Sequence, residues 1–211
     1  IDPSKIEVMV SLAVPAPRGN PSQAKLEHVR RKYALPEHFI LMIGTVEPRH
    51  NHQAVFAALA DVASPAGVVV CGRRTAWSDY LLGYARARRI AARVDFIYEL
   101  TPSDLPALFR LARVFAYLPD AAAEASVGPV VEALRAGLPM VLSDTQVNRE
   151  AAGEAAAYVR PEARGEVLAA LENALEDVSW RRTMQERERR RAELFSEYAV
   201  AERLMQIYTS L

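Results

Sequence analysis

The chain has 211 residues, of which 51% are hydrophobic, so it is long and apolar enough for one full-sized domain and unlike a disordered chain. Its 26 basic and 26 acidic side chains cancel, which gives no reason to expect nucleic acid as a partner. The single cysteine, Cys71, excludes an internal disulfide, and its apolar surroundings predict an inert, buried thiol.

Short apolar runs alternate with longer helical segments along the chain. The predicted strands cover residues 6–12, 39–44, 67–72, 94–98, 114–118, 140–143 and 156–159. Most of them are apolar throughout, which is typical of strands buried on both faces of a parallel sheet. The predicted helices cover residues 23–33, 52–62, 79–90, 103–111, 129–136 and 164–175. This strand–helix order predicts an α/β fold, a Rossmann-like doubly wound parallel sheet.

Local signals mark the ends of several helices. Thr101 is expected to cap a helix, with Pro102 at its first position and Asp104 as the acid three residues after the cap. Gly128 and Pro129 are expected to open another helix, which Gly137 closes. After residue 159 we expect only helices, with a break near residues 177–180.

Sequence motifs exclude some common sites. There is no G-x-G-x-x-G after the first predicted strand, no phosphate-binding P-loop motif and no G-x-S-x-G motif of serine hydrolases. His50 and His52 lie close together, but no third metal ligand is near them in the sequence. We therefore expect no metal site.

Residues 44–51, Gly-Thr-Val-Glu-Pro-Arg-His-Asn, form the first candidate site. They follow a buried strand and precede a helix, and in an open α/β sheet this turn lies at the edge where ligands bind. Arg49 and His50 at a helix start could hold phosphate. The alternative is an ordinary loop in which Arg49 pairs with a surface acid, and position alone favours that alternative.

Residues 124–132 form the second candidate site. Glu132 falls early in the helix that Pro129 opens, where it could accept hydrogen bonds from a diol such as ribose, and Glu124 lies on the preceding loop. Two acids at a fixed spacing are weak evidence in a chain with 26 acids.

Together the two segments resemble a known family. Residues 44–51 are similar to the "GTLEPRKN" loop of retaining family 4 glycosyltransferases, and residues 124–132 to their "EGFGLPVLE" segment. The next residues, 133–141, resemble "AMACGTPVV", and residues 105–109 resemble "LPALY". Residues 195–208 resemble "FSWERTAERLLEVY". All these matches occur in the family's order.

The resemblance implies that residues 1–211 are one nucleotide-sugar-binding domain, the carboxyl-terminal half of a GT-B enzyme. An amino-terminal acceptor domain would precede it, and helices in residues 164–211 would pack toward that domain. The partner would be a nucleotide-diphosphate sugar, with no cofactor, because side chains and a helix N-terminus meet the charge of the departing diphosphate. Such a half alone is not expected to transfer sugar. The resemblance also implies a cytoplasmic enzyme of surface polysaccharide synthesis, whose full-length form would associate peripherally with the inner membrane face.

The resemblance assigns roles to individual residues. Glu124 matches the glutamate beside the reacting centre, the catalytic position. Glu132 matches the ribose-binding glutamate, Arg49 and His50 match the pair that holds the diphosphate, and the base would stack near Tyr98. The remaining matched positions for substrate are Gly44, Thr45, Val127 and Gly128.

Two departures from the family pattern keep an alternative open. His50 replaces the family lysine, and Ala125, Ser126 and Val127 replace Gly-Phe-Gly. The glycines of the family let backbone N–H groups approach the sugar, whereas a β-branched residue such as valine disfavours the positive φ that glycine can adopt. The alternative is a degenerate relative that binds a nucleotide or a partner without catalysis. A GT-B epimerase or phosphorylase and a flavodoxin-like signalling domain fit the sequence less well.

Overall fold

A single parallel sheet forms the centre of the protein. The computed structural model describes Ile6, residues 20–120 and residues 127–209. Within these residues the strand order is β3-β2-β1-β4-β5-β6, with every neighbouring pair parallel. The strands are β1 (Phe39–Ile43), β2 (Gly67–Cys71), β3 (Val94–Ile97), β4 (Val114–Tyr117), β5 (Met140–Ser143) and β6 (Ala157–Val159). The order reverses between β1 and β4, so these strands form the topological switch point of a doubly wound fold.

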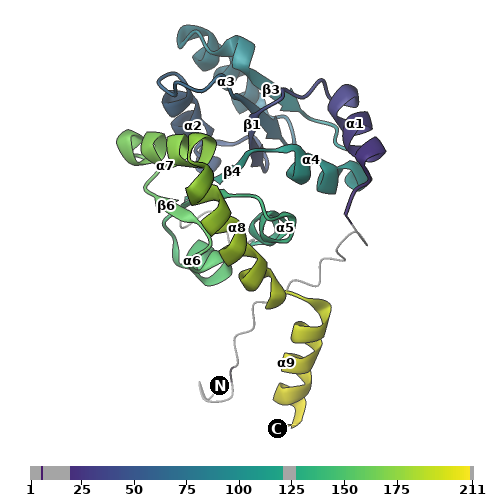
Figure 1. Ribbon diagram of the computed structural model, residues 1–211. Coiled ribbons are helices and arrows are strands. Elements are labelled where there is room, and N and C mark those ends of the chain that lie inside the picture. The colour runs from purple at the N-terminus through teal and green to yellow at the C-terminus, as the bar shows by residue number, and fades with distance from the viewer. Residues whose placement is uncertain (1–5, 7–19, 121–126, 210–211) are drawn as a thin grey trace.

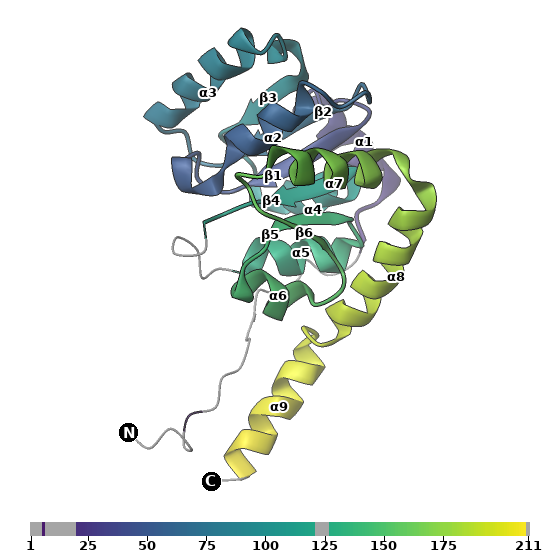
Figure 2. The same ribbon diagram turned by 90° about the vertical axis from the view of Figure 1, so that its left-hand side faces the viewer.

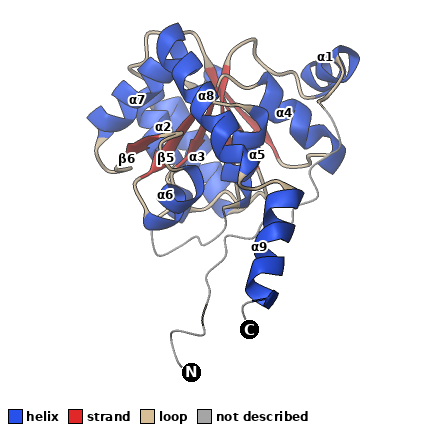
Figure 3. Ribbon diagram, turned by 60° about the horizontal axis from the view of Figure 1, so that its bottom comes forward, coloured by secondary structure: helices blue, strands red, loops and turns tan. Residues whose placement is uncertain are grey.

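Helices cover both faces of this sheet (Figures 1 and 3). One face carries α2 (His52–Leu59), α3 (Ala76–Ala87) and α7 (Arg164–Glu176). The other face carries α1 (Gln23–Lys32), α4 (Leu105–Leu111), α5 (Gly128–Ala136), α6 (Gln146–Ala152) and the end of α8 (Val178–Glu193). Two apolar clusters, one on each face, therefore form the core, and the predicted fold class is confirmed.

The apolar composition of the central strands explains their burial. All five residues of β2 are buried, and β1 is buried at four of its five positions. Cys71 ends β2 in this core, and burial raises the pKa of its thiol to about 11. The thiol is therefore protonated and unreactive at neutral pH, as the sequence predicts.

Helix caps confirm some predicted boundaries and correct others. Pro129 lies in the first turn of α5, and Gly137 ends that helix in the left-handed conformation with φ of 62°. Helix α3 begins about one turn earlier than predicted, because the Thr75 side chain accepts a hydrogen bond from the Trp77 N–H. Helix α6 was not predicted; its cap is Thr145.

Asp104 does not serve the helix cap that the sequence predicts. It is only 1% exposed, and its carboxylate accepts hydrogen bonds from Lys25, from Lys32 and from the Tyr33 hydroxyl. Burial alone would raise the pKa of Asp104, but these three hydrogen bonds outweigh it and hold the pKa well below its usual range. Thr101 makes no cap hydrogen bond and instead accepts one from Lys32 at 2.8 Å. The cluster fastens α1 to the start of α4.

The last three helices differ in how they contact the sheet. Helix α7 packs on α2 and α8 packs on α5, whereas no residue of α9 (Glu197–Thr209) is buried. Figures 1 and 2 show α9 projecting away from the sheet. Its exposed apolar side chains include Tyr198, Met205 and Tyr208. The predicted break near residues 177–180 is confirmed, since Asp177 caps α8 there.

Some of the chain lies beyond this description. Of the strand predicted over residues 6–12, all but Ile6 fall outside the described residues. Among the described helices, none combines the length and the apolarity that crossing a membrane requires.

Glu188 is an unusual core residue in α8. Its side chain is fully buried, and neither carboxylate oxygen has a hydrogen-bond partner within the described part of the chain. Burial without a partner disfavours the charged form and raises the pKa of Glu188 to about 8. The carboxyl group is therefore protonated in the folded protein over most of the acidic and neutral range.

This burial makes stability dependent on pH. In the unfolded chain Glu188 ionises above pH 4.5, its ordinary pKa, whereas in the folded chain it stays protonated up to about pH 8. The free energy of unfolding should therefore fall between these pH values, by up to about 1.4 kcal/mol per pH unit. Glu188→Gln should remove this fall, measured by urea unfolding from pH 5 to 8. The exposed neighbour variant Glu186→Gln is the control, and parallel pH profiles for wild type and Glu188→Gln would contradict the prediction.

Candidate functional site

The first candidate segment meets the loop after β4 at the switch point of the sheet. Residues 44–51 follow β1 and the residues after 117 follow β4, so both leave the carboxyl ends of adjacent strands. The Asn51 side-chain amide donates to the Leu118 carbonyl at 2.9 Å and to the Asp120 carboxylate at 2.6 Å. The Asp120 N–H in turn donates to the Arg49 carbonyl at 2.9 Å. These bonds hold the two loops together where ligands bind in open α/β sheets.

A close approach between two glycines shapes the first loop. Gly44 has φ of 145°, a conformation that side chains disfavour, and its carbonyl points at Gly72 at the end of β2. A Cβ on Gly72 would lie 1.8 Å from the Gly44 carbonyl oxygen. The backbone of the loop therefore depends on the absence of a side chain at both positions.

Two buried histidines brace the same loop from inside. His50 is 6% exposed, and its Nδ1 forms a hydrogen bond with the Thr45 carbonyl. The His50 ring also lies against Gly44, since a Cβ there would be 3.1 Å from the ring. His52 is 2% exposed, and burial lowers its pKa to about 4. His52 is thus a neutral structural group at physiological pH.

Arg49 points outward from this loop. Its Nε donates to the Glu47 carboxylate at 2.6 Å, and 45% of its side chain is exposed. Glu47 also lies 3.9 Å from the Arg73 guanidinium. The pairing of Arg49 with a surface acid, which position alone favours in the sequence, is thus present in the structure.

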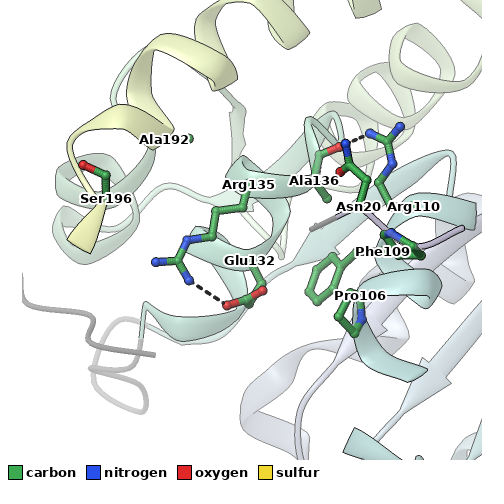
Figure 4. A pocket seen from close by; sticks show the side chains of 10 residues that line it. Asn20, Pro106, Phe109, Arg110, Glu132, Arg135, Ala136, Ala192 and Ser196 are labelled. Atoms are coloured by element: carbon green, nitrogen blue, oxygen red, sulfur yellow. Dashed lines mark hydrogen bonds and ion pairs between the residues drawn. The ribbon is translucent and has the colours of Figure 1, made fainter. Parts of the chain in front are cut away.

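Helix α5 brings Glu132 to a pocket on one face of the sheet (Figure 4). The pocket has a volume of about 420 Å³, and we call it the α4–α5 pocket. Pro106 and Phe109 of α4 line it together with Glu132 and Arg135 of α5 and with Ser196, which follows α8. The Glu132 side chain is 14% exposed, and Arg135 donates to its carboxylate at 3.1 Å.

The start of α5 tolerates the residue that replaces the family glycine. Val127 occupies the cap position with φ of −94° and ψ of 2°, so this position does not need the positive φ that favours glycine. Gly128 is the first residue of the helix. Within the described residues no side chain caps α5, and its first turn carries no acid. Glu124 lies outside the described residues.

Tyr98 lies on the other face of the sheet from Glu132. Its ring stacks on Phe96 with 5.6 Å between centroids, and the Arg74 guanidinium lies over it at 5.7 Å. These rings pack with α2 and α3, whereas Glu132 belongs to α5 on the opposite face. The structure therefore brings Pro106 and Phe109, not the Tyr98 ring, to the Glu132 pocket. The "LPALY"-like segment was the sequence signal for these two residues.

This arrangement defines a Rossmann-like α/β protein with a candidate ligand site at the carboxyl edge of its sheet. The family described as glycosyl transferases group 1 matches residues 26–191. Because the match covers well over half of the chain, the chain belongs to the group 1 glycosyl transferases.

One curated relative comes from Escherichia coli. Its O-antigen chain mannosyltransferase B is 28% identical over 181 residues, which are 83% of this chain and 47% of that protein. This chain therefore spans about half the length of the curated relative it matches.

Solved structures share the fold at low sequence identity. HepE of Anabaena, in complex with UDP and glucose, has a TM-score of 0.77 and 17% identity over 91% of this chain and 54% of that chain. A glycosyltransferase of Rickettsia africae has a TM-score of 0.80 and 15% identity over 90% and 52% of the two chains. The C-terminal domain of a group 1 family protein of Francisella tularensis has a TM-score of 0.71 and 15% identity, covering 85% of this chain and 95% of that one. The predicted fold, half of the GT-B architecture, agrees with these neighbours.

The close approach of Gly72 and Gly44 generates a test. Gly72→Ala should destabilise the protein by more than about 3 kcal/mol, or prevent folding, because its Cβ would clash with a backbone oxygen that cannot swing away. Gly83→Ala in α3 is the matched control, since nothing lies within 4 Å of its Cβ. That substitution should stabilise the helix by about 0.5–1 kcal/mol. Urea unfolding measures both, and equal effects of the two substitutions would contradict the prediction.

Proposed function

We propose that the chain is the donor-binding half of a retaining family 4 glycosyltransferase and binds a nucleotide-diphosphate sugar. The observation that carries the proposal is the position of the first motif loop at the switch point, where Asn51 ties it to Leu118 and Asp120 at the carboxyl end of β4. The family match supports transferase chemistry, and the UDP bound to the structural neighbour HepE supports a nucleotide donor.

The α4–α5 pocket supplies groups that suit a nucleoside. Pro106 and Phe109 offer an apolar wall for the base, and the Glu132 carboxylate can accept hydrogen bonds from the two hydroxyls of a ribose. A carboxylate that is already held by Arg135 costs little further ordering when the sugar binds.

The diphosphate would lie between the first loop and the start of α5. The free N–H groups of a helix start favour an anion, and α5 has no acid in its first turn to compete with one. Gly44 and Thr45 would let the phosphates approach the backbone, and Val127 and Gly128 would do so from the other side. Arg49 would exchange its exposed contact with Glu47 for the more highly charged diphosphate.

Catalysis in this proposal combines leaving-group stabilisation with Glu124. As the bond between sugar and diphosphate breaks, negative charge grows on the phosphate oxygens, and Arg49, His50 and the α5 N-terminus stabilise it. Glu124 would contact the donor sugar beside the reacting carbon. An acceptor domain would complete the enzyme, so this half alone is not expected to transfer sugar.

A degenerate, non-catalytic relative is the second candidate function. The observation that favours it is the state of the first loop, where Arg49 pairs with Glu47 and His50 is buried against Gly44. Nucleotide binding that depends on Glu132 and His50 supports a donor site. A chain that binds no nucleotide supports an interaction domain.

The biological setting follows the curated relative. An O-antigen mannosyltransferase among the relatives supports a role in bacterial surface polysaccharide synthesis. In that setting the enzyme would be cytoplasmic, at the inner membrane face.

The role of Glu132 can be tested by binding. Glu132→Ala should weaken binding of UDP or GDP by about 1.5–3 kcal/mol, the value for hydrogen bonds to a charged group. Isothermal titration calorimetry measures the affinity, and thermal unfolding shows whether the variant is folded. Glu186→Ala, an exposed acid of α8, is the control. An unchanged affinity in a folded Glu132→Ala protein would remove Glu132 from the site.

The role of His50 can be tested by substitution. If the His50 ring lies against the diphosphate, a permanent positive charge at this position should strengthen nucleotide binding.

Wild type and two variants test this contact by their affinity for UDP. His50→Asn can keep a hydrogen bond to the Thr45 carbonyl but lacks the second ring nitrogen, so it should bind UDP more weakly than wild type. His50→Lys should bind UDP more tightly than His50→Asn. Calorimetric affinities that are the same for all three proteins would exclude His50 from the phosphate site.

A further inference from the structure

Arg135 connects the Glu132 carboxylate to a distant turn of the chain. It lies in the last turn of α5, and its Nη1 donates to Glu132 Oε1 at 3.1 Å. Its Nη2 donates to the Phe195 carbonyl, 60 residues away in sequence, at 3.0 Å. The Arg135 side chain is only 18% exposed, so both bonds are largely shielded from water. Figure 4 shows its contact with Glu132.

Phe195 and Ser196 form the corner between α8 and α9. The Phe195 side chain is buried in the core, and the Ser196 hydroxyl accepts a hydrogen bond from the Ala199 N–H at 3.1 Å at the start of α9. Beyond this corner no residue of α9 is buried, so the corner fixes the root of that helix. Ser196 also lines the α4–α5 pocket, which places the root of α9 at the wall of the pocket.

We propose that Arg135 is a positioning residue that orients the Glu132 carboxylate toward a ribose diol. Through its bond to Phe195 it also links occupancy of the α4–α5 pocket to the order of the corner at which α9 begins. This inference rests on the proposed nucleotide-binding function. The ligand it concerns is a ribonucleoside diphosphate, recognised by its 2′- and 3′-hydroxyls.

The geometry of the guanidinium group explains both the orientation of Glu132 and its link to the corner before α9. Its planar fork presents donors in fixed directions, so one bond to Phe195 fixes the direction in which the other reaches Glu132. A carboxylate held in this way keeps its orientation for the two ribose hydroxyls. Because the two bonds share one rigid group, a ligand that orders Glu132 also orders the corner, and the coupling is reciprocal. A lysine at this position has a single flexible ammonium group and cannot reproduce the fork.

Sugar discrimination distinguishes positioning from a merely structural role. Calorimetry with UDP and 2′-deoxy-UDP, repeated with GDP and 2′-deoxy-GDP, should show that wild type prefers the ribonucleotide by about tenfold, the effect of one hydrogen bond to a charged group. Arg135→Met should reduce this preference below about threefold, and Arg135→Lys should restore it only in part. A structural defect would weaken both nucleotides equally and leave their ratio unchanged.

Arg191→Met is the matched control for these variants. Arg191 also fastens α8 through a backbone carbonyl, donating to Ala151 at 2.8 Å, and it lies beside the Phe195 ring. It does not line the α4–α5 pocket. The ribose preference should therefore be unchanged in Arg191→Met even if that variant is less stable.

Hydrogen exchange tests the link to α9. UDP should slow amide exchange at residues 195–199 in wild type, and this protection should disappear in Arg135→Met. A wild-type chain that binds no nucleoside diphosphate would overturn the proposed function. Nucleotide binding that depends on Glu132, but with ribose preference and corner protection unchanged in Arg135→Met, would overturn this inference alone. If Arg135→Met does not fold, unslowed exchange at the corner of wild type with UDP bound would overturn it equally.

Discussion

The candidate site depends on the hydrogen bonds that Asn51 makes across the switch point of the sheet. Reversal of strand order places the loops after β1 and β4 side by side, but only a specific contact fixes their relative positions. Asn51 provides it from a left-handed conformation with φ of 51°, which asparagine tolerates better than most residues. Its amide reaches both Leu118 and Asp120. The backbone of Arg49 is held by the same junction, so the first loop cannot move independently of the second.

Much of the fold could be predicted because its signals are local. Apolar runs marked the central strands, and Pro129 with Gly137 marked both ends of α5. Asp104 shows where local reasoning fails. An acid near a potential cap suggests a short-range role, but its partners Lys25 and Lys32 lie 79 and 72 residues away in sequence. Helix α6 was missed because the residues it buries are Asn148, Ala151 and Ala152, which give no strongly apolar helical period.

The sequence predicts which segments form the candidate site better than it predicts which side chains contact one another there. Motif spacing located the loop of Arg49, which follows β1, and the helix of Glu132, which lines the α4–α5 pocket. The side of the sheet that Tyr98 faces could have been inferred, because alternate strand residues share a face and Phe96 and Tyr98 stack there. The partner of Glu132 at the corner after α8 could not, since no sequence pattern relates Arg135 to Phe195.

Two of the few lysines in this chain bind one buried carboxylate. Only three of the chain's 26 basic residues are lysines, Lys5, Lys25 and Lys32, and the last two both bind the buried Asp104. An ammonium group is compact, so two of them and the Tyr33 hydroxyl can share one carboxylate, where two planar guanidinium groups would crowd it. The cluster holds α1 against the start of α4, the helix that supplies the apolar wall of the α4–α5 pocket. At the other end of α4, Arg110 donates to the Ala136 carbonyl that ends α5. The shape of the pocket therefore depends on contacts at both ends of α4, one of which is the ionic cluster around the buried Asp104.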